Sequence, residues 1–429
     1  MLLKKYKLPL FLSLALLMLS CEKEDNVEKT EYLIESTADF ELISQNENGW
    51  IKQARYLRAG KPSEEFEYYE NGYIKSARVY ASYPQQHLYM EVSRSEDNKP
   101  LWSKYYNPDG ELWFETAYAN GLPTVKKVYS KEGVTIHSYT KGELSSVKFT
   151  AADHSSTSIT TYDAATGSRT VSITSNGLPL LEEVYSYQEQ VGAGVYANSH
   201  VPVANPFGAT ETSYFRLNQS FFQSPTWQND ADPIELMFPF RLYEDFYDPR
   251  NSFASRFAVS TELYQSVIEQ YPITENGVLI GGSTYEDGYE HFQNKWDVRD
   301  SLAKVYDEDP ALYKLKYGTQ YVEKAGYGKL VFVIGAIRNL PTSTHAANGI
   351  KEIARRKMLG MLGGTSGITD EEQKILDKVW FEVKFFSTLK AHRNGVVITS
   401  AEDYDRALQE VNSTEPTLIQ LKYKSVENL

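Results

Sequence analysis

The chain has 429 residues, which suggests two or three domains, and 41% of them are hydrophobic, with 32 tyrosines and 19 phenylalanines dominating the aromatics. The formal net charge of −13 argues against nucleic acid as a partner. A single cysteine excludes an intramolecular disulfide framework and a thiolate metal cluster.

The N-terminus has the layout of an export signal. Three lysines precede an apolar run over residues 8–19, which is too short to span a bilayer as a mature helix. The run ends at Met18-Leu19-Ser20-Cys21, which resembles the lipobox of bacterial lipoproteins, although Met18 stands where leucine is usual. The resemblance implies a signal peptide over residues 1–20 and lipidation of Cys21. An ordinary cleaved signal with a chance cysteine is the alternative.

Residues 21–37 are predicted to be an acidic tether. The segment Glu22-Lys23-Glu24-Asp25-Asn26 is a charged patch, and its composition by itself indicates a solvated segment. It also resembles the surface-export signal of lipoproteins in the Bacteroidetes group. That resemblance implies a lipid anchor in the outer membrane of a bacterial cell envelope, with the protein exposed at the surface.

Residues 38–187 are punctuated by turn signals. The Asn-Gly and Asp-Gly pairs are Asn48-Gly49, Asn71-Gly72, Asp109-Gly110, Asn120-Gly121 and Asn176-Gly177. Such turns between aromatic and charged segments predict hairpins stacked into an all-β repeat sheet. Residues 68–75 and 105–112 look like copies of one unit, similar to MORN-type repeats, which implies a scaffold or protein-binding surface. Exposed aromatics could also stack on sugars, although tyrosines more commonly belong to a core.

Residues 188–232 are rich in glycine and proline and are predicted to be a linker. In the remaining part, residues 233–429, the aromatic-rich segment 235–247 predicts a first strand. Residues 256–270 fit a strand or a helix equally, and residues 289–305 have apolar side chains at helical spacing.

The stretch 317–337 contains an unbroken apolar run at 330–334. A run that is short and rich in β-branched residues predicts a strand buried on both faces. Gly326 and Gly328 lie just before it, and glycine at a strand entrance marks a bend or a close backbone approach. A plain central strand with a kinked start explains these residues equally well.

A helical insertion is predicted at residues 339–380. Thr369 to Glu372 has the spacing of a capping box that starts a helix to about residue 378. The elements that follow are predicted to be a strand at 382–389, a hairpin turn at Asn394-Gly395, a helix capped at 400–403 and a closing strand at 417–424.

The same region resembles the membrane attack complex/perforin and cholesterol-dependent cytolysin superfamily. Tyr317-Gly318-Thr319-Gln320-Tyr321 is similar to an aromatic-Gly-Thr-His-aromatic motif, with Gln320 where histidine is usual. Gly326-Tyr327-Gly328 stands where a glycine pair leads into a long strand, and the order of later elements is similar to the end of the cytolysins' pore-forming domain. The resemblance covers roughly residues 252–429, and we expect the cytolysins' terminal membrane-recognition domain to be absent.

This resemblance implies an α+β fold, in which a bent antiparallel sheet with flanking helical clusters follows the repeat sheet. It implies a hinge built from the motif residues Tyr317, Gly318, Thr319, Tyr321, Gly326, Tyr327 and Gly328. The clusters of this superfamily unfurl into membrane hairpins on oligomerisation. The implied partners are a lipid membrane and either copies of the chain or a second member of the superfamily.

The insertion does not have the pattern of a membrane strand. A transmembrane strand needs roughly 9–11 residues of apolar and polar alternation. Residues 350–362, written as a strand, place charges on both faces, whereas as a helix they form a continuous apolar stripe.

No catalytic constellation is present in the sequence. It contains no His-Glu-x-x-His, no Gly-x-Ser-x-Gly and no Walker loop, and the glycine-rich segment 360–367 lacks the Lys-Ser/Thr of a phosphate cradle. We therefore predict no enzymatic activity, no cofactor and no metal site, while a pair of glycan-acting carboxylates hidden in the aromatic sheet stays open.

Three functions fit these predictions. The first is a surface lipoprotein that oligomerises and perforates a target membrane. The second is a superfamily member that serves adhesion or partner binding and never inserts. The third is a repeat-based protein- or glycan-binding lipoprotein with a coincidental C-terminal match. We favour the first.

Overall fold

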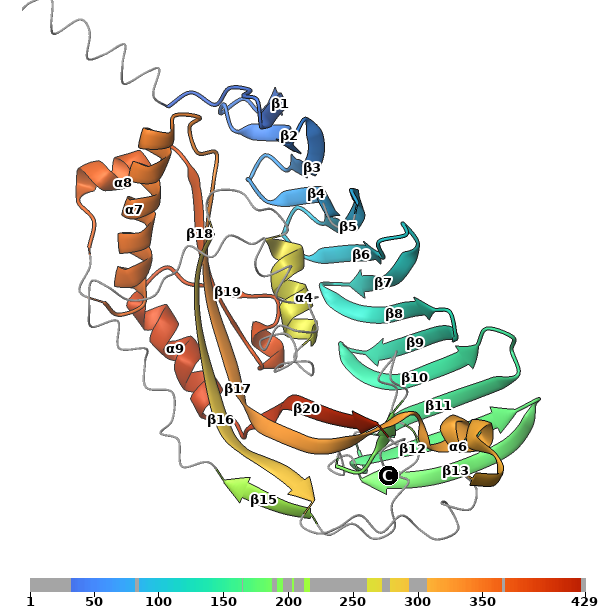
Figure 1. Ribbon diagram of the computed structural model, residues 1–429. Coiled ribbons are helices and arrows are strands. Elements are labelled where there is room, and N and C mark those ends of the chain that lie inside the picture. Colours follow the sequence, from blue (N-terminus) through green and yellow to red (C-terminus); the bar gives the residue numbers. More distant parts are fainter. Residues whose placement is uncertain are drawn as a thin grey trace, which may run out of the picture.

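The computed structural model describes residues 32–81, 85–163, 165–186, 191–195, 203, 212–216, 261–271, 278–292, 307–364 and 367–425. The signal peptide, Cys21 and the predicted strand at 235–247 lie outside these residues. The described chain is a mixed α+β fold with a long antiparallel sheet, a smaller sheet and a few helices (Figure 1).

The first sheet is a meander in which each strand pairs with the next one in the chain, so the predicted series of stacked hairpins is confirmed. Its strands are β1 Phe40–Gln45, β2 Ile51–Arg58, β3 Lys61–Tyr68, β4 Ile74–Ala81, β5 His87–Arg94, β6 Pro100–Tyr106, β7 Leu112–Ala119, β8 Leu122–Ser130, β9 Gly133–Thr140, β10 Glu143–Ala151, β11 Ser156–Asp163, β12 Ser168–Ser175 and β13 Leu178–Ser186. At Asn120-Gly121 both residues have positive φ, as a two-residue hairpin turn requires. We call β1–β13 the repeat sheet.

The second sheet has the order β15-β16-β17-β18-β19. Its strands are β15 Thr212–Arg216, β16 Val278–Phe292, β17 Gln320–Arg338, β18 Trp380–Ser387 and β19 Val396–Val397, with β14 Gly194–Val195 and β20 Thr417–Ser425 both paired to β17. The predicted linker therefore contributes β14 and β15. The helix predicted at 289–305 is wrong at its start, because residues 289–292 pair with neighbouring strands in β16, and residues 293–305 lie outside the described chain.

The helices near the C-terminal end follow the predictions closely. They are α7 Thr344–Met361, α8 Asp370–Leu376 and α9 Ala401–Asn412, and the capping box at Thr369 is present with both of its hydrogen bonds. The Asn394-Gly395 pair is not a tight hairpin turn. The connection from β18 to β19 runs over residues 388–395 and includes a short helix, η2 Lys390–His392. The segment 256–270, left open between strand and helix, contains helix α4 Thr261–Gln270.

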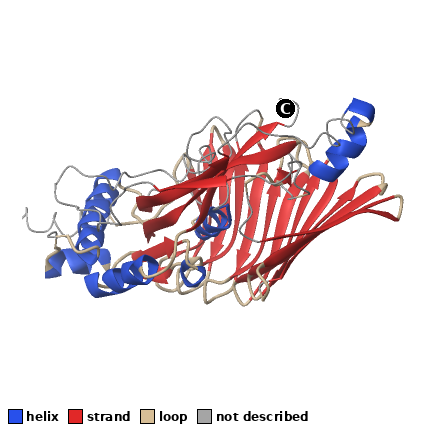
Figure 2. Ribbon diagram, turned by 90° about the horizontal axis from the view of Figure 1, so that it is seen from below, coloured by secondary structure: helices blue, strands red, loops and turns tan. Residues whose placement is uncertain are grey.

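Two hydrophobic cores lie on opposite faces of the second sheet. The first core is shared by the inner face of the repeat sheet, α4 and one face of the second sheet; its larger members are Ile51, Phe66, Ile74, Met90, Tyr105, Phe114, Leu263, Val267, Leu330, Phe332, Ile334, Trp380 and Phe386. The second core joins the other face to the helices through Val331, Val333, Ile350, Ile353, Met358, Phe385, Tyr404, Leu408 and Val411. Figures 1 and 2 show this layering, with α4 between the two sheets.

Candidate functional site

The predicted motif lies where helix α6 (Pro310–Tyr317) passes into β17. Tyr317 ends the helix, so the stretch 317–337 is not strand throughout. Gly318 has φ +77°, and a Cβ there would lie 2.2 Å from the carbonyl oxygen of Val195. The N–H of Thr319 donates to that same oxygen at 3.0 Å. Glycine is therefore required here by both the backbone angle and the close approach of β14.

The glycines Gly326 and Gly328 lie in the middle of β17 and not at its entrance, which corrects the prediction. Glu286 and Gly288 of β16 pair with Gly328 and Tyr327, so β16 carries an extra residue there. On β20, Gln420 pairs with Gly326 and Leu418 pairs with Tyr327, so this strand also carries an extra residue. Bulges in β16 and β20 therefore both lie beside Tyr327, and bulges bend a sheet at the point where they occur. Figure 1 shows the long β16–β17 pair curving strongly along its length.

The apolar run beyond this point confirms a strand buried on both faces. Leu330, Phe332 and Ile334 face the first core, while Val331 and Val333 face the second. The insertion that follows β17 covers the second face. Helix α7 buries Ile350, Ile353, Ala354 and Met358 there, and Arg356 forms an ion pair with Glu372 of α8.

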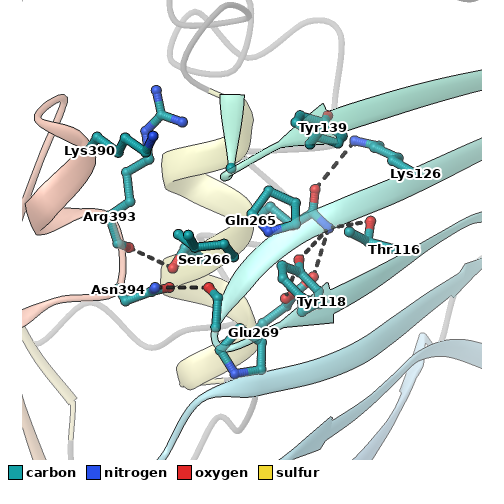
Figure 3. A pocket seen from close by; sticks show the side chains of 15 residues that line it. Thr116, Tyr118, Lys126, Tyr139, Gln265, Ser266, Glu269, Lys390, Arg393 and Asn394 are labelled. Carbon is teal, nitrogen blue, oxygen red and sulfur yellow. Dashed lines mark hydrogen bonds between the residues drawn. The ribbon is translucent and has the colours of Figure 1, made fainter. Parts of the chain in front are cut away.

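A pocket of about 50 Å³ that opens to solvent lies where the repeat sheet, α4 and the loop around η2 meet. The polar residues that line it are Thr116, Tyr118, Lys126, Tyr139, Gln265, Ser266, Glu269, Lys390, Arg393 and Asn394 (Figure 3). They come from three parts of the chain that are far apart in sequence. Pockets at the junction of structural layers are common ligand sites, so this is a candidate binding site.

The floor of the pocket is a hydrogen-bonded polar network on α4. Glu269 is buried and accepts from the hydroxyl of Tyr118 at 2.9 Å and from Nε2 of Gln265 at 2.8 Å. Gln265 Nε2 also donates to Thr116 Oγ1 at 3.1 Å, and Lys126 Nζ donates to Gln265 Oε1 at 3.3 Å. Burial raises the pKa of the Glu269 carboxyl, and the hydrogen bonds from its neighbours oppose that rise.

A second polar cluster ties the two sheets together. The guanidinium of Arg338 lies 4.1 Å from the ring centroid of Trp380 and donates to the carbonyl of Gly72 at 2.5 Å. The Tyr73 hydroxyl donates to Glu382 at 2.7 Å, and Glu382 pairs with the buried Lys384 at 3.1 Å. Burial lowers the pKa of Lys384, while Glu382 works in the opposite direction. These contacts fix how the repeat sheet sits on the second sheet.

The structure also contains a hydrogen-bonded series of three side chains that the sequence analysis missed. Ser387 Oγ lies 2.9 Å from His392 Nδ1, and His392 Nε2 lies 2.9 Å from Glu410. The order of groups is that of a nucleophile, a base and an acid. However, Ser387 is fully buried and its oxygen accepts the N–H of Leu389 at 3.1 Å. This series of side chains therefore joins η2 to α9, and its serine is not accessible to a substrate.

Within the described residues, no group of three or more His, Cys, Asp or Glu side chains is placed to hold a metal ion. Among the same residues, no helix combines the length and apolarity needed to cross a bilayer.

No protein-family model and no curated protein matches the chain. Two of the solved structures that give partial likenesses are as follows. One is described as accessory secretory protein 1, 2 and 3 in Streptococcus pneumoniae, with 17% identity, a TM-score of 0.17, and coverage of 26% of this chain and 21% of that one. The other is a GtfA/B complex bound to UDP and GlcNAc, with 15% identity, a TM-score of 0.13, and coverage of 36% and 28%. The chain spans less than a third of either protein, and likenesses at these scores carry no argument.

Proposed function

We propose that this chain is a surface lipoprotein, anchored through Cys21, that oligomerises on a membrane through its bent second sheet and perforates that membrane. The observation that carries the proposal is the paired register break around Tyr327, where both neighbours of β17 carry an extra residue. A bulged strand pair is a natural point for a sheet to change its bend. The insertion α7–α8 follows β17 directly in the chain and covers one face of the C-terminal half of that strand.

The segment nearest the anchor supports the proposal. Tyr32 lies under Lys378, with Nζ 4.3 Å from its ring, and the N–H of Thr342 donates to the carbonyl of Leu33 at 2.9 Å. The N–H of Glu35 donates to Thr342 Oγ1 at 2.9 Å. Thr342 precedes α7 and Lys378 follows α8, so residues 32–35 contact both ends of the insertion. We call these residues the N-terminal strap.

The strap brings the insertion close to the anchor. Residue 32 follows Cys21 by eleven positions, a length of chain that reaches about 40 Å at most. The insertion is therefore held within reach of the membrane that carries the lipid. Release of the strap would free both ends of the insertion together.

The charges on α7 favour a second candidate, assembly or partner binding without insertion. Arg355 pairs with Glu352, and Arg356 pairs with Glu372, so the exposed side of the helix is ionic. In a barrel strand over residues 350–362 such charges would fall on both faces, and each lipid-facing one would cost about 2–4 kcal/mol near the midplane. Dye release separates the two candidates.

The test locks the strap to the insertion. Glu35→Cys with Thr342→Cys places two thiols where the backbone N–H and side chain already meet. The wild type should form oligomers on phosphatidylethanolamine–phosphatidylglycerol or cholesterol-containing vesicles and release dye. The oxidised double variant should do neither until it is reduced, whereas Thr342→Cys alone should behave as the wild type.

Two further variants complete the design. Gly326→Val with Gly328→Val should leave a folded monomer that does not assemble. Cys21→Ala should lose palmitate labelling and membrane partition. Assembly without dye release would transfer support to the non-inserting candidate, and a wild type that neither assembles nor leaks on any membrane, with or without a co-expressed partner, would overturn the proposal.

A further inference from the structure

An amine, an amide and a carboxylate meet in a buried cluster between α4 and β18. The side chain of Lys384, on β18, is only 5% exposed, and its Nζ lies 3.1 Å from Glu382 Oε1. The same Nζ donates to Gln270 Oε1 at 3.2 Å. Gln270 is the last residue of α4 and is also buried. The three groups are therefore held together away from water.

A chain of hydrogen bonds fixes which amide atom of Gln270 faces Lys384. Ser266 Oγ donates its proton to the Arg393 carbonyl at 2.6 Å, so it accepts from Gln270 Nε2 at 3.3 Å (Figure 3). This arrangement turns Oε1, and with it the carbonyl carbon, toward the Lys384 amine. The amide nitrogen lies on the side of Ser266, which lines the junction pocket that opens to solvent.

The surroundings of the cluster favour a neutral, nucleophilic amine. Burial lowers the pKa of Lys384, the positive charges of Arg94 and Arg338 act in the same direction, and Glu382 opposes them. The Tyr73 ring lies 5.4 Å from Nζ, and its hydroxyl donates to Glu382 at 2.7 Å. A lysine desolvated among apolar groups can act as a nucleophile once a neighbouring base has taken its proton.

We propose that Lys384 and Gln270 join in an isopeptide bond that forms within the folded chain. Glu382 takes one proton from the Lys384 ammonium, and the free Nζ then attacks Gln270 Cδ. The Cδ–Nε2 bond breaks, and the leaving nitrogen takes one further proton from Nζ and the proton held by Glu382, so that ammonium departs. One amide replaces another, and the step therefore consumes no oxidant, reductant or cofactor. Holding the reacting groups in contact makes such an attack effectively unimolecular.

The bond would close a long loop of the chain. Gln270 and Lys384 are 114 positions apart, and β16, β17 and the insertion α7–α8 lie between them. A covalent link across such a loop restricts the unfolded chain and so stabilises the folded one. Helix α4 would then be joined to the second sheet covalently and to the repeat sheet through Glu269 and Tyr118. The proposal is independent of membrane assembly.

The first experiment compares the masses of the denatured full chain and of Lys384→Met. After correction for the substitution, the wild type should be lighter by one molecule of ammonia, since any lipid on Cys21 is common to both. Asn-Gly pairs can also lose ammonia by closing to a succinimide, so a proteolytic digest must locate the loss. The digest of the wild type should contain a branched peptide that joins Lys384 to Gln270.

Two variants separate the reacting groups from the base. Gln270→Leu should abolish the branched peptide. Glu382→Gln keeps the amine and the amide but loses the proton acceptor, so the linked fraction should rise about a hundredfold more slowly, or less, after refolding. In a denaturing gel the wild type should run ahead of both variants, because the closed loop keeps the denatured chain more compact.

The matched control is a second lysine–glutamine contact. Lys357 of α7 donates to Gln373 of α8, but both side chains are partly exposed to water. Lys357→Met should keep the loss of ammonia, and no branched peptide should join Lys357 to Gln373.

Three results would overturn the proposal. They are equal corrected masses for the wild type and Lys384→Met when circular dichroism shows both to be folded, a loss of ammonia that maps only to an Asn-Gly pair, and a branched peptide at Lys357. Linking of Glu382→Gln at the rate of the wild type would overturn the role of Glu382 as the base.

Discussion

Single residues decide where the two sheets can approach each other. Gly72 has φ +81°, and a Cβ on it would lie 2.4 Å from the Trp380 ring. Gly318 allows a similarly close approach within the second sheet, between the start of β17 and β14. At both places the absence of a side chain allows a segment that is distant in sequence to come close, so the requirement for glycine comes from the packing as well as from the backbone angle.

The first prediction concerns Gly318. Gly318→Ala should destabilise the fold by about 2 kcal/mol or more, because the backbone angle is strained for alanine and its Cβ would collide with Val195. The matched control is Gly349→Ala in α7, where a Cβ meets nothing within 4 Å. That change should stabilise the helix by about 0.5–1 kcal/mol. Denaturant unfolding measures both, and equal effects of the two substitutions would contradict the packing argument.

The second prediction concerns His137 of β9, which pairs directly with Lys126 of β8. Burial and the neighbouring Lys126 lower the pKa of His137 to about 4. The ordinary pKa of histidine, about 6.5, applies to the unfolded chain, and the lowered pKa of about 4 applies to the folded chain. At pH values between these two, the unfolded chain binds a proton that the folded chain does not. Stability should therefore fall as the pH falls through this window.

The control for this pH effect is another histidine. His137→Asn should flatten the fall in urea midpoint between pH 6.5 and 4.5. His154→Asn, at an exposed turn with positive φ, should keep the slope of the wild type. If His137→Asn keeps that slope as well, His137 does not carry the effect.

At the scale of elements, the repeat sheet has a continuous row of alternating charges on its outer face. The row crosses eight strands through directly opposed residues: Glu41, Arg55, Glu65, Arg78, Glu91, Lys104, Glu115 and Lys127. Tyrosines reinforce it, since Tyr80, Tyr106 and Tyr129 each donate to a glutamate of the row. Opposed charges at directly paired positions favour one register over a slipped one.

The third prediction tests this row. Arg78→Glu places three acids in line, because Glu65 and Glu91 lie on either side of residue 78. It should cost about 1 kcal/mol of unfolding free energy, and the loss should shrink in high salt. Arg78→Lys keeps the charge and should be nearly neutral. A loss for Arg78→Glu that is unchanged by salt would indicate a packing effect instead.

At the scale of the whole molecule, the repeat sheet is joined to the rest through a shared core. Its inner face meets α4 and the second sheet over apolar residues, and the cluster of Arg338, Tyr73, Glu382 and Lys384 adds polar contacts at one end. A large apolar junction holds two layers in one arrangement more firmly than a polar one. The two halves are therefore expected to move together until a ligand or a membrane changes the junction.

The fourth prediction is that residues 38–187 form a β domain when expressed alone. Its pairing is entirely between chain neighbours, so the hairpins do not need the second sheet to form. The isolated domain should give a β-type far-UV CD spectrum and should bind a dye for apolar surfaces more strongly than the full chain does, because its inner face is uncovered. A predominantly helical spectrum, or no added dye binding, would contradict this.

The sequence by itself determined the local structure. The Asn-Gly and Asp-Gly turns predicted the hairpins, the capping box predicted α8, and the apolar run at 330–334 predicted a strand buried on both faces, because turn angles, caps and alternation depend on neighbouring residues. Only the tertiary structure decided what depends on distant residues. It made 289–292 a strand by pairing it with β15 and β17, and it placed the bend around Tyr327 in mid-strand through bulges in β16 and β20. It also assembled the junction pocket from three remote segments, and no local pattern encodes such an encounter.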